Sequence, residues 1–550
     1  MIKIKTLVFL SLTIFISNNF QAQKPIDSLL VKLDSILEVK NIPGAMISIV
    51  NSDSIIFAGG IGYANLEKKE AVTSDHLFRL GSISKSFTAI GLVKLLAEKQ
   101  LSLSSPIAEI DPTLDLKNSW KATAPITIEQ ILEHTAGFDD MHNHASYNTT
   151  DTETPSCLAM VKVHKKSLYA RWQPGTRMAY SNPGYVLAGH LMEQISQQPY
   201  YQYLKDNLLI PLGMSESGFF FKQPSDRLMA EGYVREGNQF STTDFKSVNG
   251  GPASDLCSNA KEMSLFLMFL LSKKIPQTPA SLIDEKWFDR IENPATTLAA
   301  KNGFIGGYGL GNMTVWANNY LFHGHDGGID GFSSMYLYSR EANFGLAISI
   351  NKQGGLWTLI DEILNFYLGP NQIQNTKYQP IPEKTRNKFS GFYNFKSPRN
   401  QTMYFIQKMM TGHSITFEDN YLLVKDFGDV VRDTLYHKGN NQFYRKTEGL
   451  PFVMLLEDEN KKAILWLGND YAEKENKTIR VLKNYVLLGS VMMSVLGFFV
   501  GFGWWIKRFF TKEKVSTNSR LILWLPSFFF ILMIISFVAT AYPSVQPHLA

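Results

Sequence analysis

One stretch in the N-terminal quarter of the chain sets the strongest condition on its fold. Residues 77–87 read Leu-Phe-Arg-Leu-Gly-Ser-Ile-Ser-Lys-Ser-Phe, and apolar residues then recur with mostly helical spacing as far as Leu96. This pattern predicts a loop that turns into a buried helix, with Ser82 in its first turn and Lys85 on the same face. The positive end of the helix dipole would favour an alkoxide at Ser82, and partial burial would keep Lys85 neutral enough to take its proton.

The Ser-x-x-Lys spacing alone is not decisive, because it occurs three times in the chain. Ser258 precedes Lys261 at the predicted start of a helix, where a serine is explained as an N-cap. Ser349 precedes Lys352 in a predicted strand, which lacks the helical turn that would align the two groups. The nucleophile interpretation therefore stays with Ser82, and its support must come from the rest of the chain.

The length and composition of the chain predict a multidomain folded protein. Its 550 residues are 45% hydrophobic and 13% aromatic, which is enough for two or three domains with cores of their own. The net charge of +5 comes from 54 basic and 49 acidic residues that are interleaved, without a basic arm or stripe. We therefore predict no nucleic-acid partner.

The first 22 residues have the pattern of a secretory signal peptide. A basic start is followed by an apolar run too short to span a membrane and by the small residue Ala22, after which we place the cleavage. An uncleaved anchor is the alternative, because Phe20 fits the cleavage pattern poorly. In both cases the chain that follows is expected to be exported.

The C-terminal region has two long runs without a charged residue, 485–506 and 521–542. Each reaches the roughly 20 residues that a membrane-spanning helix needs, so we predict two transmembrane helices. Positive-inside bias places the loop 507–520 in the cytoplasm and everything before Tyr485 outside. The basic residues of this loop, which outnumber the single acidic Glu513, are Lys507, Arg508, Lys512, Lys514 and Arg520.

Between the termini the sequence divides into two folded regions. Residues 23–369 mix helical and strand patterns, residues 370–383 form a linker, and residues 384–482 alternate short aromatic and β-branched runs with turns. We interpret the last region as a small β domain without a catalytic constellation. The elements expected in the first region include a helix over 26–37, a hairpin over 45–57, a strand over 320–325, a tight turn over 327–331, strands over 334–338 and 344–350, and a helix over 356–368.

A second candidate motif is Tyr180-Ser181-Asn182. It falls on the predicted turn before a helix, where side chains can project into a cleft. The same Tyr-x-Asn pattern occurs at 63–65, where the end of a strand explains it better.

A metal site is a weaker possibility in the polar segment 138–156. His142 and His144 follow Asp139 and Asp140, but no third firmly spaced ligand accompanies them. We therefore interpret the segment as a long solvated loop beside a cleft. We predict neither a metal nor another cofactor.

The chain has two cysteines, Cys157 and Cys257. Export would make a disulfide chemically possible, and their spacing does not decide whether they come within bonding distance. Two unpaired, partly buried thiols are favoured, because a domain of this size does not depend on a covalent link.

Three features now occur in order along one α/β region: Ser82 with Lys85, Tyr180 with Asn182, and His325 followed by two residues that open a glycine-rich turn. With these motifs, residues 24–369 resemble the serine β-lactamase and penicillin-binding-protein superfamily, in particular its class C-like branch. Supporting phrases are Gly81-Ser82-Ile83-Ser84-Lys85-Ser86-Phe87, Leu132-Glu133-His134-Thr135-Ala136-Gly137, Pro174-Gly175-Thr176, Gly324-His325-Asp326-Gly327-Gly328 and Gly331-Phe332-Ser333-Ser334.

The resemblance implies a fold of the α/β (α+β) class. Its expected architecture is an antiparallel sheet flanked by helices together with an all-helical region, followed in this chain by the small β domain and the two transmembrane helices. The catalytic roles that it implies fall on three residues: Ser82 attacks a carbonyl to form an acyl-enzyme, while Lys85 and Tyr180 share the work of the general base. The backbone N–H groups of Ser82 and Gly328 would form the oxyanion hole.

The substrate-binding residues that the resemblance implies are Asn182, which would also orient Lys85, and the run His325, Asp326, Gly327 and Gly328. Glycines in this run would let a substrate approach the strand edge closely. Many relatives carry a lysine where this chain has His325. A histidine is largely neutral at pH 7, which weakens a β-lactamase or carboxypeptidase interpretation and favours a broader peptidase or esterase. A purely structural strand histidine is the alternative.

These predictions combine into one functional hypothesis. The chain is expected to be a serine hydrolase anchored in a bacterial inner membrane, with its catalytic domain on the periplasmic side. It would act through an acyl-enzyme on D-amino-acid peptides, amides or esters. The alternatives are an esterase for small esters or lipids, and a sensor that is acylated by penicillin-like compounds without turnover. The specificity lies in loops that the sequence does not resolve.

Overall fold

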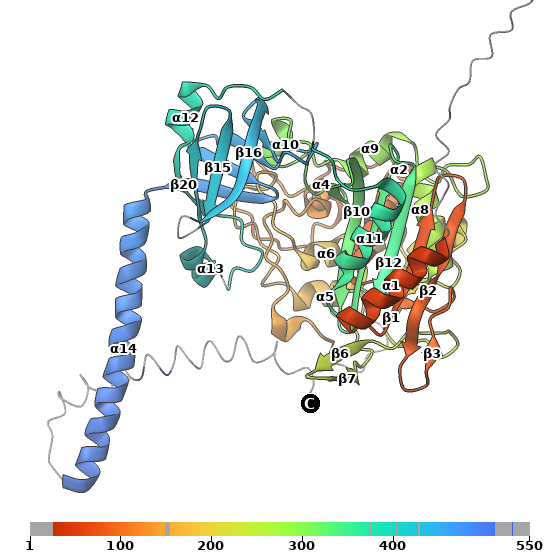
Figure 1. Ribbon diagram of the computed structural model, residues 1–550, viewed down its shortest axis with the longest axis horizontal. Coiled ribbons are helices and arrows are strands. Elements are labelled where there is room, and N and C mark those ends of the chain that lie inside the picture. Colours follow the sequence, from red (N-terminus) through yellow and green to blue (C-terminus); the bar gives the residue numbers. More distant parts are fainter. Residues whose placement is uncertain are drawn as a thin grey trace, which may run out of the picture.

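The computed structural model describes residues 26–148, 155–373, 377–402, 404–426 and 430–511, together with residues 528 and 531. The first part is a seven-stranded sheet with helices on both faces, and the second is a closed eight-stranded barrel that leads into the long helix α14, Lys477–Thr511 (Figure 1). The predicted signal peptide lies outside the described residues.

The first part, the sheet domain, is built on an antiparallel sheet with the strand order β3-β2-β1-β12-β11-β10-β9. Its N-terminal hairpin pairs with β12, where Ala45 lies opposite Ile350, so strands from both ends of the domain share one sheet. The expected antiparallel sheet is confirmed. The strands are β1 Gly44–Val50, β2 Ile55–Asn65, β3 Glu70–Ala71, β9 Met313–Ala317, β10 Tyr320–Ile329, β11 Phe332–Ser339 and β12 Phe344–Ile350.

Helices cover both faces of this sheet, because alternate strand residues are apolar on each side. Helices α1 (Ile26–Lys40) and α11 (Leu356–Leu368) cover one face, in the positions where the sequence predicts helices (Figure 1). Ile47 and Leu337 of the sheet pack in the same apolar cluster as these two helices. Met46 and Tyr336 pack on the other face with α8 and α2. The other helices of the domain are α2 Ser84–Glu98, α3 Ile107–Ile110, α4 Ile128–Leu132, α5 Cys157–Val163, α6 Asn182–Ser196, α7 Tyr200–Leu204, α8 Ala260–Ser272, α9 Lys286–Glu292 and α10 Leu298–Lys301.

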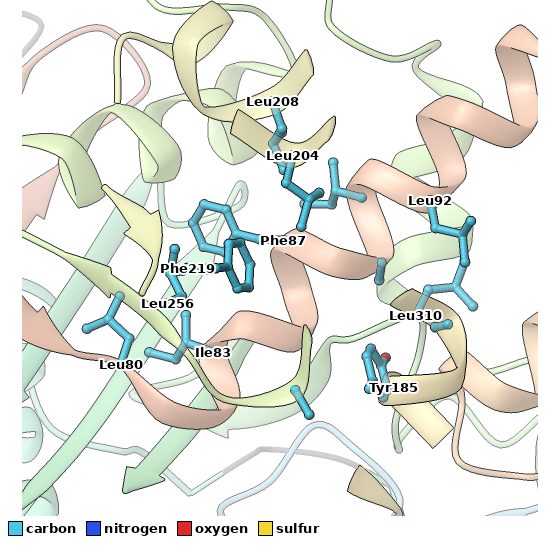
Figure 2. Packing of buried hydrophobic residues seen from close by; sticks show 14 of the residues in the cluster. Leu80, Ile83, Phe87, Leu92, Tyr185, Leu204, Leu208, Phe219, Leu256 and Leu310 are labelled. Carbon is cyan, nitrogen blue, oxygen red and sulfur yellow. The ribbon is translucent and has the colours of Figure 1, made fainter. Parts of the chain in front are cut away.

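Helix α2 runs through the middle of the domain and is buried along nearly its whole length. Phe87 stacks on Phe266 of α8 with 4.1 Å between ring centroids, and Leu204 and Tyr185 lie near α2 in the all-helical region (Figure 2). The predicted buried helix is confirmed. Packing on all sides fixes the start of α2 at Ser84. Ser82 lies not in the first turn of this helix, as predicted, but on the 3₁₀ turn directly before it.

Two local predictions need correction. Strand β10 does not end before its glycines: Gly327 pairs with Ser334 and Gly328 with Ser333, so the predicted turn over 327–331 contracts to the two residues between β10 and β11. Ser258 is not the N-cap of α8 but the last residue of strand β8, and the cap is Asn259, whose side chain accepts from Glu262 N. Glycines pair in a strand as other residues do, and asparagine caps at least as well as serine.

The two cysteines are free thiols in different parts of the domain. Cys157 opens α5, and Cys257 lies in the three-stranded sheet β4-β8-β5. Both are buried, and burial raises the pKa of the Cys257 thiol to about 12. The expectation of unpaired thiols is confirmed. The short strands here are β4 Phe78–Arg79, β5 Gly218–Phe219 and β8 Leu256–Ser258, with the separate hairpin β6 Tyr233–Glu236 and β7 Gln239–Thr242.

The predicted β domain forms the closed barrel β13 to β20. An apolar cluster joins it to the sheet domain, with Phe304 from the sheet domain and Trp466 and Tyr471 from the barrel. Trp316 Nε1 donates to Thr447 O at 2.9 Å beside it. The elements are α12 Glu383–Phe389, β13 Gly391–Phe395, α13 Tyr404–Met410, β14 His413–Phe417, β15 Tyr421–Asp426, β16 Val431–Gly439, β17 Gln442–Tyr444, β18 Val453–Glu457, β19 Ala463–Leu467 and β20 Asp470–Glu475.

Helix α14 contains the predicted span 485–506 and extends away from the barrel (Figure 1). Among the described residues, no helix combines the length and the apolar character needed to cross a membrane. The prediction of two transmembrane helices is therefore unsupported at 485–506. The second predicted span, 521–542, lies almost wholly outside the described residues.

The glycine pair of β10 gives a matched test of how this strand packs on the Ser82 loop. A Cβ at Gly327 would lie 2.0 Å from Leu80 O, whereas a Cβ at Gly328 would meet nothing within 4 Å. We expect Gly327→Ala to lower the free energy of unfolding by roughly 1–3 kcal/mol, because the strand and the loop must separate. Gly328→Ala is the control and should unfold at nearly the wild-type temperature. Equal midpoints for both variants in thermal unfolding would contradict this packing.

Candidate active site

Ser82 lies on a short 3₁₀ turn, Gly81–Ile83, that runs directly into α2. Gly81 has a φ of +54°, and a Cβ there would lie 2.9 Å from the backbone nitrogen of Gly328. Only glycine combines this left-handed conformation with such a close approach. The turn thus brings half-buried Ser82 against the edge of β10.

Lys85 is fully buried beside Ser82. Its Nζ donates to Ser82 Oγ at 3.0 Å and to Ala253 O at 2.8 Å. Burial lowers the pKa of the Lys85 amine to about 7, which the charge of Asp140 opposes and the charge of Arg399 reinforces. The amine is therefore partly uncharged near neutral pH and lies within hydrogen-bond reach of the hydroxyl proton.

Tyr180 lies on the other side of this pair. The centroid of its ring is 4.9 Å from Lys85 Nζ. Burial raises the pKa of Tyr180 far above its ordinary value, although hydrogen bonding to Ser82 and the charge of Arg399 act in the opposite direction. Tyr180 is therefore a neutral phenol that can donate a proton.

Asn182 is the first residue of α6, but its contacts differ from the predicted ones. Its Nδ2 and its backbone N both donate to Asp140 Oδ1, each at 2.9 Å. The hydrogen bonds described for Lys85 go to Ser82 and Ala253 instead. Asn182 thus reaches the site through Asp140. Its predicted roles, to hold the substrate and to orient Lys85, stay predictions.

His325 is placed by β10 inside the protein and not at its surface. Its side chain has no exposed area, and its Nε2 lies 2.7 Å from Tyr308 Oη, while Nδ1 contacts the carbonyl of Asp326. Burial lowers the pKa of His325 to about 4, so the ring is neutral. The Asp326 side chain is 64% exposed and its Oδ1 lies 3.6 Å from His325 Nδ1, so Asp326 is the residue of this pair that is open to solvent. The predicted substrate contacts of both residues stay predictions.

The comparison with known proteins agrees with this geometry. The family model described as "Beta-lactamase" matches residues 32–363. The chain belongs to the beta-lactamase family. A curated relative, "Protein flp" of Staphylococcus aureus strain MW2, is 25% identical over 379 residues, which cover 68% of this chain and 71% of the relative.

Solved structures of low sequence identity share the fold of this family member. The octameric penicillin-binding protein homologue from Pyrococcus abyssi has a TM-score of 0.55 at 21% identity and covers 82% of this chain and 100% of its own. D-amino acid amidase from Ochrobactrum anthropi SV3 has a TM-score of 0.51 at 22% identity and covers 62% of this chain and 98% of its own. FmtA from Staphylococcus aureus has a TM-score of 0.51 at 18% identity and covers 64% of this chain and 90% of its own.

An aromatic cluster behind the candidate active site was not predicted from the sequence. The ring centroid of His134 lies 4.2 Å from that of Tyr180, 5.2 Å from that of Tyr185 and 4.6 Å from that of Tyr308. Burial, with help from the charge of Lys85, lowers the pKa of His134 well below its ordinary value. These rings exclude water from Lys85. His134 belongs to a phrase that carried the family resemblance, but no local pattern marked it as part of the site.

Two charged residues at the site were also missed or misplaced. Asp140 was predicted on a solvated loop, yet it is buried and accepts hydrogen bonds from Asn182 and Met141 N. Arg399 comes from the barrel domain, in which no catalytic group was expected, and its guanidinium carbon lies 4.7 Å from the Tyr180 ring centroid. Within the described residues, no group of three or more His, Cys, Asp or Glu side chains is placed to hold a metal ion.

The lowered pKa of Lys85 predicts how the reactivity of Ser82 depends on pH. We expect the rate of labelling by a neutral fluorophosphonate to rise with pH through a midpoint near 7 and then to level off, because only the uncharged amine accepts the proton. Two pH units below the midpoint the rate should fall about 100-fold. The second-order rate constant between pH 5 and 9 measures this. Lys94→Arg, on an outer position of α2, is the control and should leave the midpoint in place; a rate independent of pH would contradict the role of Lys85.

Proposed function

We propose that this protein is a serine hydrolase that forms an acyl-enzyme at Ser82. The observation that carries the proposal is the 3.0 Å contact between Lys85 Nζ and Ser82 Oγ. A buried amine with a pKa of about 7 is suited to take the serine proton at neutral pH. The membership of the family adds support, since the same chemistry is expected from the motif.

The proposed reaction has two stages. Lys85 takes the proton of Ser82 as Oγ attacks the substrate carbonyl, and the N–H groups of Ser82 and Gly328 bind the oxyanion. Tyr180 passes its proton to the leaving group, which departs and leaves an ester on Ser82, and Tyr180 takes back the proton that Lys85 holds, so that Lys85 is uncharged again. Water then attacks the ester while Lys85 takes one of its protons. The acyl group leaves as the acid, and Lys85 returns that proton to Ser82 Oγ. General-base assistance of this kind contributes about two to four powers of ten in rate, and one oxyanion donor roughly 3 kcal/mol.

The proposed substrates are peptides, amides or esters of D-amino acids. One structural neighbour is a D-amino acid amidase recorded with D-phenylalanine, and another, SurE, is recorded with D-Leu. Both are likenesses of fold at 22% and 20% identity, so they support this substrate class only as a proposal. The neutral, buried His325 fits a substrate that does not need a cation from β10.

Replacement of the nucleophile tests the proposal. We expect a fluorophosphonate or a labelled penicillin to mark the wild-type chain and not Ser82→Ala, because the variant lacks the attacking oxygen. Ser349→Ala is the matched control: this serine also precedes a lysine by three residues, but its hydroxyl is buried and has no described hydrogen-bond partner. Mass spectrometry of the labelled protein locates the adduct. Undiminished labelling of Ser82→Ala would refute the assignment.

The rate of deacylation separates turnover from mere acylation. An enzyme for D-amino-acid substrates releases product continuously from a D-amino amide or peptide. An esterase would turn over p-nitrophenyl esters alone, and an acylated sensor would keep a stable adduct and release no product. Product release and adduct lifetime, measured on the same sample, distinguish these three outcomes.

We further propose that α14 and the segment after it attach the protein to a bacterial inner membrane, with the catalytic domain on the periplasmic side. Large apolar side chains along α14 are exposed, among them Met493 at 70% and Phe499 at 63%. Exposed apolar surface of this extent is typical of a membrane or protein contact. The positively charged segment 507–520 supports the proposed orientation.

Membrane attachment has its own test. We expect the full-length chain to remain in the membrane fraction after carbonate and to leave it only in detergent. Leu496→Arg should weaken this retention, because a charge in the middle of an apolar span costs roughly 2.5–3.5 kcal/mol. Val39→Arg, at an exposed apolar position of α1 in the catalytic domain, is the control and should leave membrane retention unchanged. Release of the wild type by carbonate alone would contradict the proposal.

A further inference from the structure

A loop of the barrel domain is built into the edge of the catalytic site. After β13 it passes beside the start of the segment 138–156, where Asp140 N donates to Arg399 O at 3.2 Å. Gln401 N donates to Asp139 Oδ1 at 2.8 Å, and Arg399 Nε donates to Asp140 Oδ2 at 2.6 Å. Three hydrogen bonds thus fix the loop at two adjacent carboxylates.

Asp140 connects this loop to the catalytic residues. Its Oδ2 accepts from Arg399, while its Oδ1 accepts from the backbone and the side chain of Asn182. Only 4% of Asp140 is exposed, so its charge needs a partner within the protein. Among the described contacts of Asp140, Arg399 is the group that supplies a full positive charge.

Asp140 also acts on Lys85, the base of the proposed reaction. The charge of Asp140 favours the protonated amine, and the charge of Arg399 opposes it. An arginine stays charged at every pH of interest, so the Arg399 charge disfavours protonation of Lys85 throughout this range. The titratable or charged groups that face Lys85 are Asp140 and Asp326, Arg399, the neutral histidines His134 and His325, and the protonated phenols of Tyr180 and Tyr185.

We infer that Arg399 is a positioning residue for the reaction at Ser82: from the barrel domain it neutralises Asp140, which keeps Lys85 available as the base and holds Asn182 at the start of α6. This inference rests on the proposed function, because it assigns a role toward the same nucleophile and base. It makes the docked barrel a part of the active site. The residue lies outside the matched family region of 32–363.

The test is the pH profile of Ser82 labelling in the full-length chain. With Arg399→Gln, Asp140 loses its counter-charge, and we expect the midpoint to rise by about one pH unit. At pH 6 the labelling rate by a neutral fluorophosphonate should fall about tenfold, whereas at pH 9.5 it should equal that of the wild type. A merely structural loss would lower the rate at every pH. Arg399→Lys should keep the wild-type midpoint, because it keeps the charge.

Two further variants separate charge from docking. The double variant Arg399→Gln with Asp140→Asn removes both charges and should return the midpoint toward the wild-type value. Arg177→Gln is the matched control: Arg177 also binds the barrel, through Lys396 O at 3.1 Å and Glu473 Oε1 at 3.0 Å, but is not part of the Asp140 contacts. The pH midpoint of Ser82 labelling in Arg177→Gln should equal that of the wild type.

The outcomes distinguish this inference from the proposed function. An unchanged midpoint in Arg399→Gln, or an equal rise in Arg177→Gln, would overturn the inference and leave the nucleophile in place. A wild-type chain in which Ser82 is not labelled at any pH would refute the proposed function, and the inference with it.

Discussion

The site depends on the burial of one amine against one hydroxyl, Lys85 Nζ beside Ser82 Oγ. Transfer of an ammonium ion into a protein interior costs several kcal/mol, so the protein must either pair the charge or lose it. Lys85 does some of each: Ala253 O accepts from it, two tyrosine rings face it, and its pKa falls to about 7. The proposed reactivity of Ser82 depends on this lowered pKa of Lys85, and the tightly packed helix α2 keeps the amine in place.

The residues around Lys85 must be rigid, because an amine displaced from this site would be solvated by water and would become protonated. Phe87, two residues after Lys85, is locked against Phe266, and Gly81 lets the preceding turn contact β10. The aromatic cluster around His134 closes the site from behind. The contacts that stabilise the start of α2 therefore also determine the protonation state of Lys85.

The sequence predicts well those parts of the fold and site that depend on local patterns. Apolar periodicity locates α1, α2 and α11. The ordered motifs point to Ser82, Lys85 and Tyr180, which the structure brings together. The burial of His325 is not visible in a local pattern, and the exposed position falls on its neighbour Asp326. Arg399 shows a deeper limit: it contacts Asp140 across 259 residues of sequence, and no periodicity or spacing records such a contact.

That long-range contact changes how the two domains relate. An apolar cluster around Trp466 holds the barrel on the catalytic domain, and such clusters are non-directional, so by themselves they would tolerate small shifts. The hydrogen bonds of the loop to Asp139 and Asp140 are directional and fix one arrangement. Because Asp140 is buried and charged, separation of the domains would leave its carboxylate without Arg399 and would draw the proton back to Lys85. Docking of the barrel supplies Arg399 to Asp140, and the same charge pairing lets Lys85 stay uncharged as the proposed base.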